Sequence, residues 1–401
     1  MTWTARHPRI VIVGAGLAGL RAAERLSELN FDGEVLIIGE EQHRPYHRPG
    51  LIDQLLTGKL DSHDMALRTY VELGDCWRIG TRVYRLDPAQ HLLYLPGAEK
   101  LRYDGLIIAT GLRPRLLPGA PLRDPRVHLL RTLDEAAAIR STLAASKGRV
   151  VVIGTGFTGC EVAASMRSLH RKVTIVGRSR TLLGNALGAE FGAQINGLHQ
   201  RNGTDLALGT KPRDWHCTPD YVEIRLSDER TLQASCVILA VGSVPGTQWL
   251  RGSGIDITDG VLCEPTCFVV GVEDVVAAGD VACWPNPRFD VGPNRYEHWL
   301  NAAEMGQAAA ENLLTGRSQA HPYSPLPRFW SEQYGMRIQV AGMPALATKT
   351  LSLTKPSSAS WKPIVDYFKD GQQIGVVGVD QPRKMLRLIR NLSTESALLM
   401  P

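Results

Sequence analysis

Short apolar runs alternate with amphipathic segments at the start of the chain. The run Ile10 to Val13 is apolar on both faces, which is typical of a strand in a buried parallel sheet. Apolar residues at helical spacing follow from Leu20 to Leu29, and another strand-like run covers Glu34 to Ile38. The order strand, helix, strand predicts a parallel βαβ unit.

The same order recurs near the middle of the chain. Val150 to Ile153 is predicted to be a strand, Val162 to Leu169 has helical spacing, and Val173 to Val176 is predicted to be the next strand. The chain therefore contains two units of the same kind, which is more specific than either unit alone.

A glycine-rich turn follows the first strand. Gly14-Ala15-Gly16-Leu17-Ala18-Gly19 matches the pattern G-x-G-x-x-G. The first glycine permits a tight turn, the second lets the backbone approach a pyrophosphate, and the third lets helix and strand pack closely. Glu40, at the end of the next strand, stands where an acid accepts hydrogen bonds from ribose hydroxyls. The alternative is a loop that merely resembles the motif.

The second turn, Gly154-Thr155-Gly156-Phe157-Thr158-Gly159, repeats the pattern, but its next strand ends differently. Gly177 replaces the ribose-binding acid, and Arg178 and Arg180 follow. A carboxylate there would repel the 2′-phosphate of NADPH, whereas arginines can bind it, so NADPH is favoured over NADH. The alternative is that both arginines are solvated loop residues.

Composition restricts the other possibilities. The 401 residues are too many for one ordinary core, and 44% hydrophobic with 21% charged residues is a normal globular balance. The sequence shows no membrane span and no signal-peptide core, so we expect a cytoplasmic enzyme. The net charge of +5 comes from dispersed basic residues, so nucleic acid is not an expected partner. Seven scattered cysteines favour reduced thiols, and the histidines lack metal-ligand spacing, so no metal is expected.

Further segments match the motifs of one family. They are Arg44 to Pro49, Ile107 to Gly111, Leu130 to Asp134, Ala277 to Val281 and, as the most discriminating, Phe329 to Tyr334. Over nearly its whole length the chain resembles the FAD-dependent NAD(P)H:ferredoxin reductases that serve oxygenases, of the putidaredoxin-reductase and biphenyl-dioxygenase-reductase type.

The resemblance implies an α/β fold with two Rossmann-like dinucleotide-binding domains, arranged as in glutathione reductase, and a small α+β C-terminal domain. It implies hydride transfer from NAD(P)H to FAD, followed by single-electron transfer to an iron–sulfur ferredoxin, expected to be of the [2Fe–2S] type. That ferredoxin would feed a haem-thiolate monooxygenase or a Rieske oxygenase.

The resemblance and the glycine motifs together imply the site residues. The FAD site would comprise Gly14, Gly16, Ala18, Gly19, Glu40, Arg48, Asp53, Val83, Ala109, Arg131, Asp280 and Trp299. The NAD(P)H site would comprise Gly154, Gly156, Thr158, Gly159, Arg178, Arg180 and Gly242. Trp330 would pack by the flavin or the nicotinamide, and Glu161 would hold the nicotinamide carboxamide. The alternative for Glu161 is an acid of the first helical turn, stabilised by the helix dipole.

One position departs from the family. Asp53 replaces a lysine that, in the family, can pair with the acid matching Glu161. Two carboxylates at this place would repel each other and raise one pKa. Otherwise the loop takes another course, or a cation such as Arg44 or Arg48 substitutes for the lysine.

The expected FAD-binding domain is discontinuous. It would cover residues 1–113 and 245–320, with the NAD(P)H-binding domain, 114–244, inserted between them and a C-terminal domain at 321–401. The linkers are rich in proline and glycine, from Arg113 to Gly119 and from Val241 to Pro245.

Within the C-terminal domain the pattern predicts three strands, a loop and a helix. The strands are Ile338 to Ala341 and a hairpin around Asp370-Gly371, formed by Ile364 to Phe368 and Ile374 to Val379. Thr348 to Ser360 is predicted to be a loop. The helix, Arg383 to Leu392, carries a basic run that could meet an acidic ferredoxin or simply be solvated.

Two other functions compete with the reductase. A flavin-dependent disulfide, peroxide or NAD(P)H oxidase enzyme needs a redox cysteine beside the flavin, and Glu40 to Leu56 contains none. The other is a redox or interaction flavoprotein like the relatives of apoptosis-inducing factor, which usually carry targeting sequences and long insertions that are not visible in this sequence.

Overall fold

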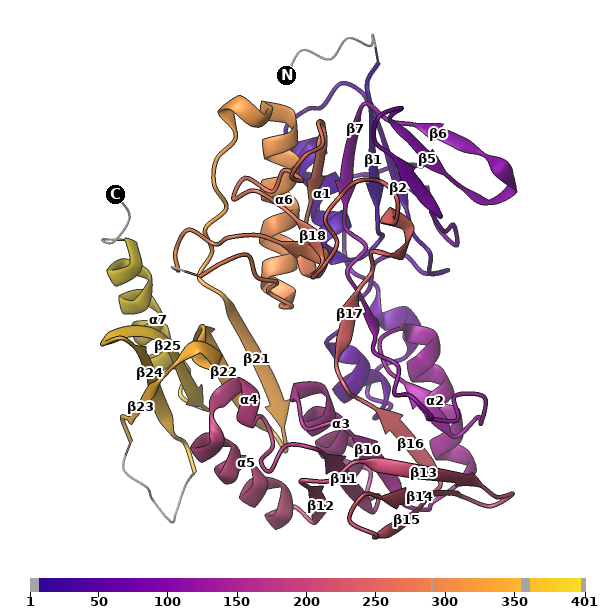
Figure 1. The fold of residues 1–401 in the computed structure, drawn as a ribbon, viewed down its shortest axis with the longest axis vertical. Coiled ribbons are helices and arrows are strands. Elements are labelled where there is room, and N and C mark those ends of the chain that lie inside the picture. Colours follow the sequence, from indigo (N-terminus) through magenta and orange to yellow (C-terminus); the bar gives the residue numbers. More distant parts are fainter. Residues whose placement is uncertain (1–6, 290, 355–360, 398–401) are drawn as a thin grey trace.

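The structure, a computed structural model, describes residues 7–289, 291–354 and 361–397. It shows two Rossmann-like units, with a smaller sheet and helix beside the second unit (Figure 1).

The first unit is built on a five-stranded parallel sheet in the order β19-β7-β1-β2-β3. Its strands are β1 (Arg9–Val13), β2 (Glu34–Ile38), β3 (Trp77–Arg78), β7 (Gly105–Ile108) and β19 (Val275–Ala277). The helices α1 (Leu17–Glu28) and α6 (Trp299–Thr315) pack against each other. The central β1 is buried, as its continuous apolar run predicts, because α1 packs against it and it shares one apolar core with Leu86, Leu93 and Leu101 of a small antiparallel sheet.

Two small sheets accompany the first unit. One is antiparallel, in the order β4-β5-β6, with strands β4 (Arg85–Asp87), β5 (Leu92–Tyr94) and β6 (Lys100–Arg102). The other pairs β18 (Val261–Leu262) with β20 (Ala282–Cys283).

The second unit repeats the plan with a parallel sheet in the order β12-β11-β10-β16-β9. Its strands are β9 (Val127–Leu129), β10 (Val150–Ile153), β11 (Val173–Gly177), β12 (Thr204–Leu208) and β16 (Cys236–Leu239). Its helices are α2 (Leu133–Ala145), α3 (Phe157–Ser168), α4 (Gly184–Leu187) and α5 (Ala189–Arg201). An antiparallel sheet of β13 (Pro212–Cys217), β14 (Val222–Leu226) and β15 (Thr231–Ala234) completes it.

Two short strands connect the units. β8 (Leu112–Pro114) and β17 (Ser243–Pro245) pair antiparallel in the segments predicted as linkers (Figure 1). The chain passes out to the second unit along β8 and returns along β17, and β19 then joins the first sheet. The domain limits 1–113, 114–244, 245–320 and 321–401 themselves stay a prediction.

The C-terminal unit is an antiparallel sheet in the order β21-β22-β25-β24-β23 with one helix, α7 (Pro382–Ala397). Its strands are β21 (Arg328–Gln333), β22 (Met336–Gly342), β23 (Lys349–Ser352), β24 (Ile364–Lys369) and β25 (Gln372–Val379). At the β24–β25 turn, Asp370 and Gly371 have φ of 50° and 82°, as a two-residue hairpin requires. β21 lies against α3 of the second unit (Figure 1).

The loop prediction for Thr348 to Ser360 is wrong in part, because β23 lies within it. All four residues of β23 are exposed, so no alternation of buried and exposed positions marks the strand; its pairing with β24 creates it. Residues 355–360 of this prediction lie outside the described residues.

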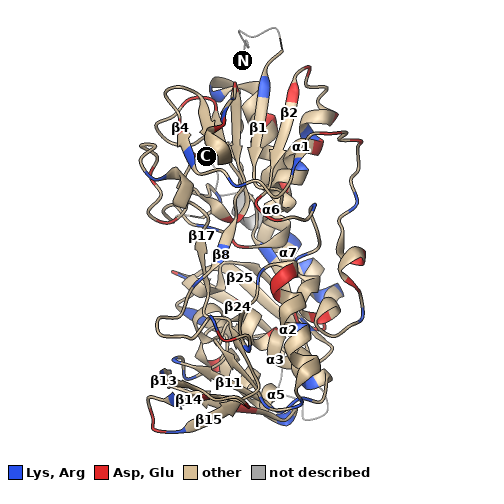
Figure 2. Cartoon of the chain, turned by 90° about the vertical axis from the view of Figure 1, so that its right-hand side faces the viewer, with Lys and Arg blue, Asp and Glu red and all other residues tan. Residues whose placement is uncertain are grey.

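Charged residues of both signs are interspersed over all parts of the molecule in the view of Figure 2. No helix in the described part of the chain is long and apolar enough to cross a membrane.

Candidate functional site: a cleft with two glycine turns

The two glycine turns open into one continuous cleft. Each follows the carboxyl end of a central parallel strand, β1 or β10, which is where such sheets bind ligands. The cleft has a volume of about 1900 Å³ and is lined by residues of both turns. Pockets for drug-sized ligands have volumes of about 300–1,000 Å³, so this cleft has room for two dinucleotides.

The first glycine of each turn occupies a position that only glycine tolerates. Gly14 and Gly154 have φ of 123° and 138°. A Cβ on Gly14 would lie 2.1 Å from the Ala109 carbonyl oxygen, and one on Gly154 would lie 1.9 Å from that of Ala240. Both turns are therefore held against the neighbouring strand of their own sheet.

The second glycine of each turn leaves an open surface beside a helix N-terminus. A Cβ on Gly16 or Gly156 would meet no protein atom within 4 Å. Both residues are helix N-caps without a capping side chain, and neither α1 nor α3 has an acid in its first turn. The free N–H groups and the helix dipoles fit the pyrophosphates of FAD and NAD(P)H.

The third glycine of each turn serves helix packing and does not line the cleft. A Cβ on Gly19 would lie 2.0 Å from the Gly14 carbonyl oxygen, and one on Gly159 would lie 2.3 Å from that of Gly154. These two residues shape the turns from behind, so any contact with a cofactor would be indirect.

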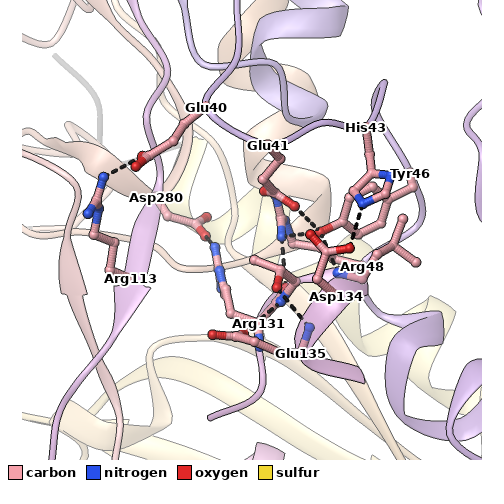
Figure 3. A network of polar contacts seen from close by, with 12 residues as sticks. Glu40, Glu41, His43, Tyr46, Arg48, Arg113, Arg131, Asp134, Glu135 and Asp280 are labelled. Carbon is pink, nitrogen blue, oxygen red and sulfur yellow. Dashed lines mark hydrogen bonds and ion pairs between the residues drawn. The ribbon is translucent and has the colours of Figure 1, made fainter. Parts of the chain in front are cut away.

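Ion pairs frame the first half of the cleft (Figure 3). Glu40 is exposed at the end of β2 and pairs with Arg113 of β8 and, at 3.6 Å, with Arg82. Arg131 Nη2 lies 3.0 Å from Asp280 Oδ2, which joins two segments predicted to bind FAD. The Arg131 backbone N–H also donates to Glu135 at 2.6 Å, so the N-terminal cap of α2 fixes this arginine.

Arg48 forms hydrogen bonds with residues of the first unit and with the segment just before α2. Its guanidinium donates to Glu41 at 2.6 Å, to the Tyr46 hydroxyl at 2.6 Å and to the Arg131 carbonyl oxygen at 2.7 Å (Figure 3). The Arg44 guanidinium lies 5.6 Å from the centre of the Trp77 ring. Among the contacts of the described residues, neither arginine pairs with Glu161, so neither replaces the missing lysine.

Glu161 and Asp53 both line the cleft, and among the described residues that line it the one lysine is Lys211, after β12. Glu161 is the fifth residue of α3, beyond its first turn, so the alternative of a first-turn acid is not supported. Loss of hydration raises the pKa of Glu161 to about 7; the Ser331 hydroxyl lowers it, and the charge of Asp53 raises it further. The predicted rise of one pKa is thus confirmed in direction, with burial rather than charge repulsion as the main cause.

Aromatic rings from three parts of the chain meet where the two halves of the cleft join. Phe329 of β21 stacks on His298, with ring centres 4.3 Å apart, and meets Phe157 of α3 edge-on at 5.0 Å. Trp330 follows on the same strand, and the Arg337 guanidinium lies over its ring, 4.9 Å from the ring centre. Trp299 meets His47 edge-on at 5.4 Å. These rings line the cleft where its two halves join, and the packing of Trp330 by the flavin or the nicotinamide stays a prediction.

Most of the predicted site residues line this one cleft. They are Gly14, Gly16, Ala18, Glu40, Arg48, Asp53, Val83, Ala109, Arg131, Gly154, Gly156, Thr158, Glu161, Arg178, Gly242, Asp280, Trp299 and Trp330. Arg180 does not line it and is exposed, because the chain leaves the cleft after Ser179. Whether these residues bind the cofactors stays a prediction.

Several residues that line the cleft are not among those predicted from the sequence. Lys211 is exposed at the cleft after β12, the strand next to β11, so its place beside a strand end of the second unit was the available signal. Phe157 belongs to the second glycine turn, Phe329 begins the segment Phe329 to Tyr334, and His298 precedes Trp299, but only the tertiary structure shows that their rings touch.

Among the described residues that line the cleft there is no cysteine. Cys160 of α3 is fully buried, and burial raises the pKa of its thiol, which makes it a poor nucleophile. No group of three or more His, Cys, Asp or Glu side chains is placed to hold a metal ion within the ranges that the structure describes.

The fold and the cleft define an oxidoreductase with two dinucleotide sites. Residues 8–306 match the family model described as pyridine nucleotide-disulphide oxidoreductase, and residues 328–399 match the one described as reductase C-terminal. The chain belongs to this family, whose members bind FAD and NAD(P)H.

Curated relatives narrow the subgroup. The ferredoxin–NAD(+) reductase component of the p-cumate 2,3-dioxygenase system of Pseudomonas putida is 35% identical over 83% of this chain and 81% of its own length. Rhodocoxin reductase of Rhodococcus erythropolis is 32% identical over 97% of this chain and 90% of its own length. The predicted membership in the oxygenase-coupled ferredoxin reductases is thereby confirmed.

Solved structures agree. Putidaredoxin reductase, in its covalent complex with putidaredoxin, superposes with a TM-score of 0.88 at 27% identity, over 96% of this chain and 93% of that one. An engineered water-forming NADPH oxidase reaches a TM-score of 0.85, but at 20% identity this shows the fold alone.

Proposed function

We propose that this protein is an FAD-dependent NAD(P)H:ferredoxin reductase. It would pass electrons one at a time to an iron–sulfur ferredoxin that feeds an oxygenase of the haem-thiolate or Rieske type. The observation that carries the proposal is the single cleft into which both glycine turns open, with β21 of the C-terminal unit at their junction. The names of the relatives support the ferredoxin as the electron acceptor.

When bound, FAD supplies hydride acceptance and the stepwise release of electrons, and the protein supplies binding and orientation. The N-termini of α1 and α3 bind the two pyrophosphates beside Gly16 and Gly156. Glu40 accepts hydrogen bonds from ribose hydroxyls. Phe329 and His298 exclude water from the junction of the two sites. Glu161 faces this junction and, at neutral pH, is divided between its protonated and ionised forms.

We propose further that NADPH is the preferred electron donor. The strand registers correct the prediction for Gly177: Ile38 pairs with Val13 and Val176 with Ile153, so Gly177 matches Gly39, and Arg178, which lines the cleft, matches Glu40. Lys211 adds a second cation on the same side of the cleft. Several relatives are named for NAD(+), so this preference would distinguish the chain from them.

A cytoplasmic location fits the state of the thiols. All seven cysteines are free, and five of them are buried, as expected in a reducing compartment.

One experiment tests the function. The holoenzyme is reduced anaerobically with NADPH or NADH in a stopped-flow instrument and then mixed with a panel of [2Fe–2S] ferredoxins or with oxygen. We expect at least one ferredoxin to reoxidise the flavin faster than oxygen does, and NADPH to give the higher kcat/KM. Reoxidation by oxygen that is faster than by every ferredoxin would contradict the reductase and favour an oxidase. Slow flavin reduction with a persistent coenzyme complex would favour the interaction flavoprotein.

A further inference from the structure

A row of hydrogen-bonded side chains leads from Glu161 into the protein interior. Ser331 Oγ donates to Glu161 Oε1 at 2.6 Å, and Gln333 Nε2 donates to Ser331 Oγ at 3.1 Å. His199 Nε2 lies 3.0 Å from Gln333 Oε1. Ser331, Gln333 and His199 are each at most 1% exposed, so water does not compete for these bonds.

The row continues beyond the imidazole ring of His199. The Tyr334 hydroxyl lies 2.9 Å from His199 Nδ1, and Thr204 Oγ1 lies 2.9 Å from the Tyr334 hydroxyl. Thr204 is buried and Tyr334 is half-buried. The row thus joins α3, β21, α5 and β12, and so ties the C-terminal sheet to the second dinucleotide unit.

The bonds share one direction. Because the amide nitrogen of Gln333 donates to Ser331, its oxygen is left to accept a hydrogen bond from the Nε2–H of His199. Burial lowers the pKa of His199 to about 4, so the ring is neutral at physiological pH and its Nδ1 accepts from Tyr334. Every donor then points toward Glu161, and the row ends on the carboxylate in the cleft.

We propose that His199 is a positioning residue for the reaction with NAD(P)H: through Gln333 and Ser331 it fixes the Glu161 carboxyl at the junction of the two sites. The inference rests on the proposed function for the identity of the coenzyme. Without an Nε2–H on His199, Gln333 can rotate its amide and the Ser331 hydroxyl loses its fixed orientation. Glu161 then keeps the backbone N–H of Glu332 but loses an oriented hydroxyl donor. A displacement of about 1 Å at a reacting site can cost up to about 100-fold in rate.

Two substitutions separate the two ring nitrogens. His199→Gln places an amide donor near the position of Nε2 and keeps the bond to Gln333. His199→Asn places an acceptor near the position of Nδ1, keeps the bond to Tyr334 and loses the donor to Gln333. Anaerobic stopped-flow reduction of the holoenzyme gives a limiting rate and a coenzyme Kd for each variant. We expect His199→Gln to stay within about twofold of wild type and His199→Asn to lose about tenfold in limiting rate with little change in Kd.

The pH profile gives a readout that a purely structural role would not change. Asp53, Glu332, Cys160 and Ser331 are the charged, titratable or hydrogen-bonding groups that act on or with Glu161. The Ser331 hydroxyl favours the ionised form of Glu161, so His199→Asn should move the midpoint of flavin reduction to higher pH. Equal limiting rates and equal pH midpoints in His199→Gln and His199→Asn would overturn the proposal. Equal losses of limiting rate in the two variants, with equal losses of thermal stability, would also overturn it.

A matched control is available in His128, another buried histidine of the second unit. Its Nε2 lies 2.9 Å from Thr142 Oγ1, and it is not among the residues of the row. We expect His128→Asn to leave the limiting rate and the pH midpoint unchanged.

A spectroscopic test needs no electron acceptor. In ¹⁵N-histidine-labelled holoenzyme, the His199 signals, assigned by their loss in His199→Gln, should show the Nε2–H tautomer and no protonation down to about pH 5. The Nδ1–H tautomer would overturn the proposal. Neither this test nor flavin reduction involves a ferredoxin, so the proposal can hold even if the ferredoxin assignment fails.

Discussion

Replacing Glu161 with glutamine should stabilise the protein at alkaline pH and change little at acidic pH. The side chain keeps its size and its place beside Ser331 but can no longer ionise. In the native protein the pKa of Glu161 rises from 4.5 to about 7, chiefly because its carboxyl loses hydration. Ionising the group in the folded state therefore costs about 3 kcal/mol more than in the unfolded chain, at about 1.4 kcal/mol per pKa unit.

The sign follows from proton linkage. Below the unfolded pKa of 4.5, Glu161 is protonated in both states and imposes no cost. As the pH rises toward about 7, the unfolded chain releases the proton while the folded protein retains it, so the free energy of unfolding falls. The advantage of Glu161→Gln should therefore grow from less than about 1 kcal/mol near pH 5 to about 3 kcal/mol near pH 9.

Thermal unfolding of the two holoproteins across this pH range measures the effect. The entropy of unfolding is about 2.1 cal/mol/K per residue, or about 0.8 kcal/mol/K for a chain of this length, so the difference in Tm should approach about 4 °C at the alkaline end. Glu190→Gln, at an exposed acid at the start of α5, is the matched control for the loss of a carboxylate from the surface. A Tm difference for Glu161→Gln that is the same at both ends would refute the reasoning.

Three further predictions concern the cleft. Asp53→Asn removes a charge that raises the pKa of Glu161, so the pH midpoint of flavin reduction should move down; an unchanged midpoint would mean that Asp53 does not act on this carboxyl. Arg178→Ala should raise the KM for NADPH about tenfold and leave the KM for NADH unchanged, since a hydrogen bond to a charged group is worth about 1.5–3 kcal/mol. Steady-state kinetics with both coenzymes measures the effect. Equal changes in the two KM values would show that the arginine is merely solvated. Gly154→Ala should lower the free energy of unfolding by about 3 kcal/mol or more, because the φ of Gly154 is 138°, and Gly156→Ala should fold normally but bind NAD(P)H more weakly. Thermal melts and coenzyme titrations distinguish the two variants. A stable Gly154→Ala protein would contradict the strain argument.

Local sequence determined the two dinucleotide units. The first and second strands of each unit, β1 with β2 and β10 with β11, occur where the apolar runs predict them. This was possible because a strand, a glycine turn and a helix are consecutive, so that periodicity and a few glycines specify them together. The position of Glu40 after β2 follows from the same local geometry, whereas the sequence placed the missing acid one residue early, because Arg178 and not Gly177 matches Glu40.

Only the tertiary structure determined which residues of the separate units contact each other. Nothing in the local pattern predicted that Ser331 would reach Glu161 across 170 positions of sequence, or that His199 would stand behind Gln333. The edge strand β23 exists through pairing with β24, and Arg180 leaves the cleft through the path of its loop. The sequence predicted that a carboxylate pair would raise one pKa, but the amount depends on how much water the folded cleft excludes from Glu161. That exclusion is a property of surfaces brought together from distant segments, and no single segment of sequence encodes it.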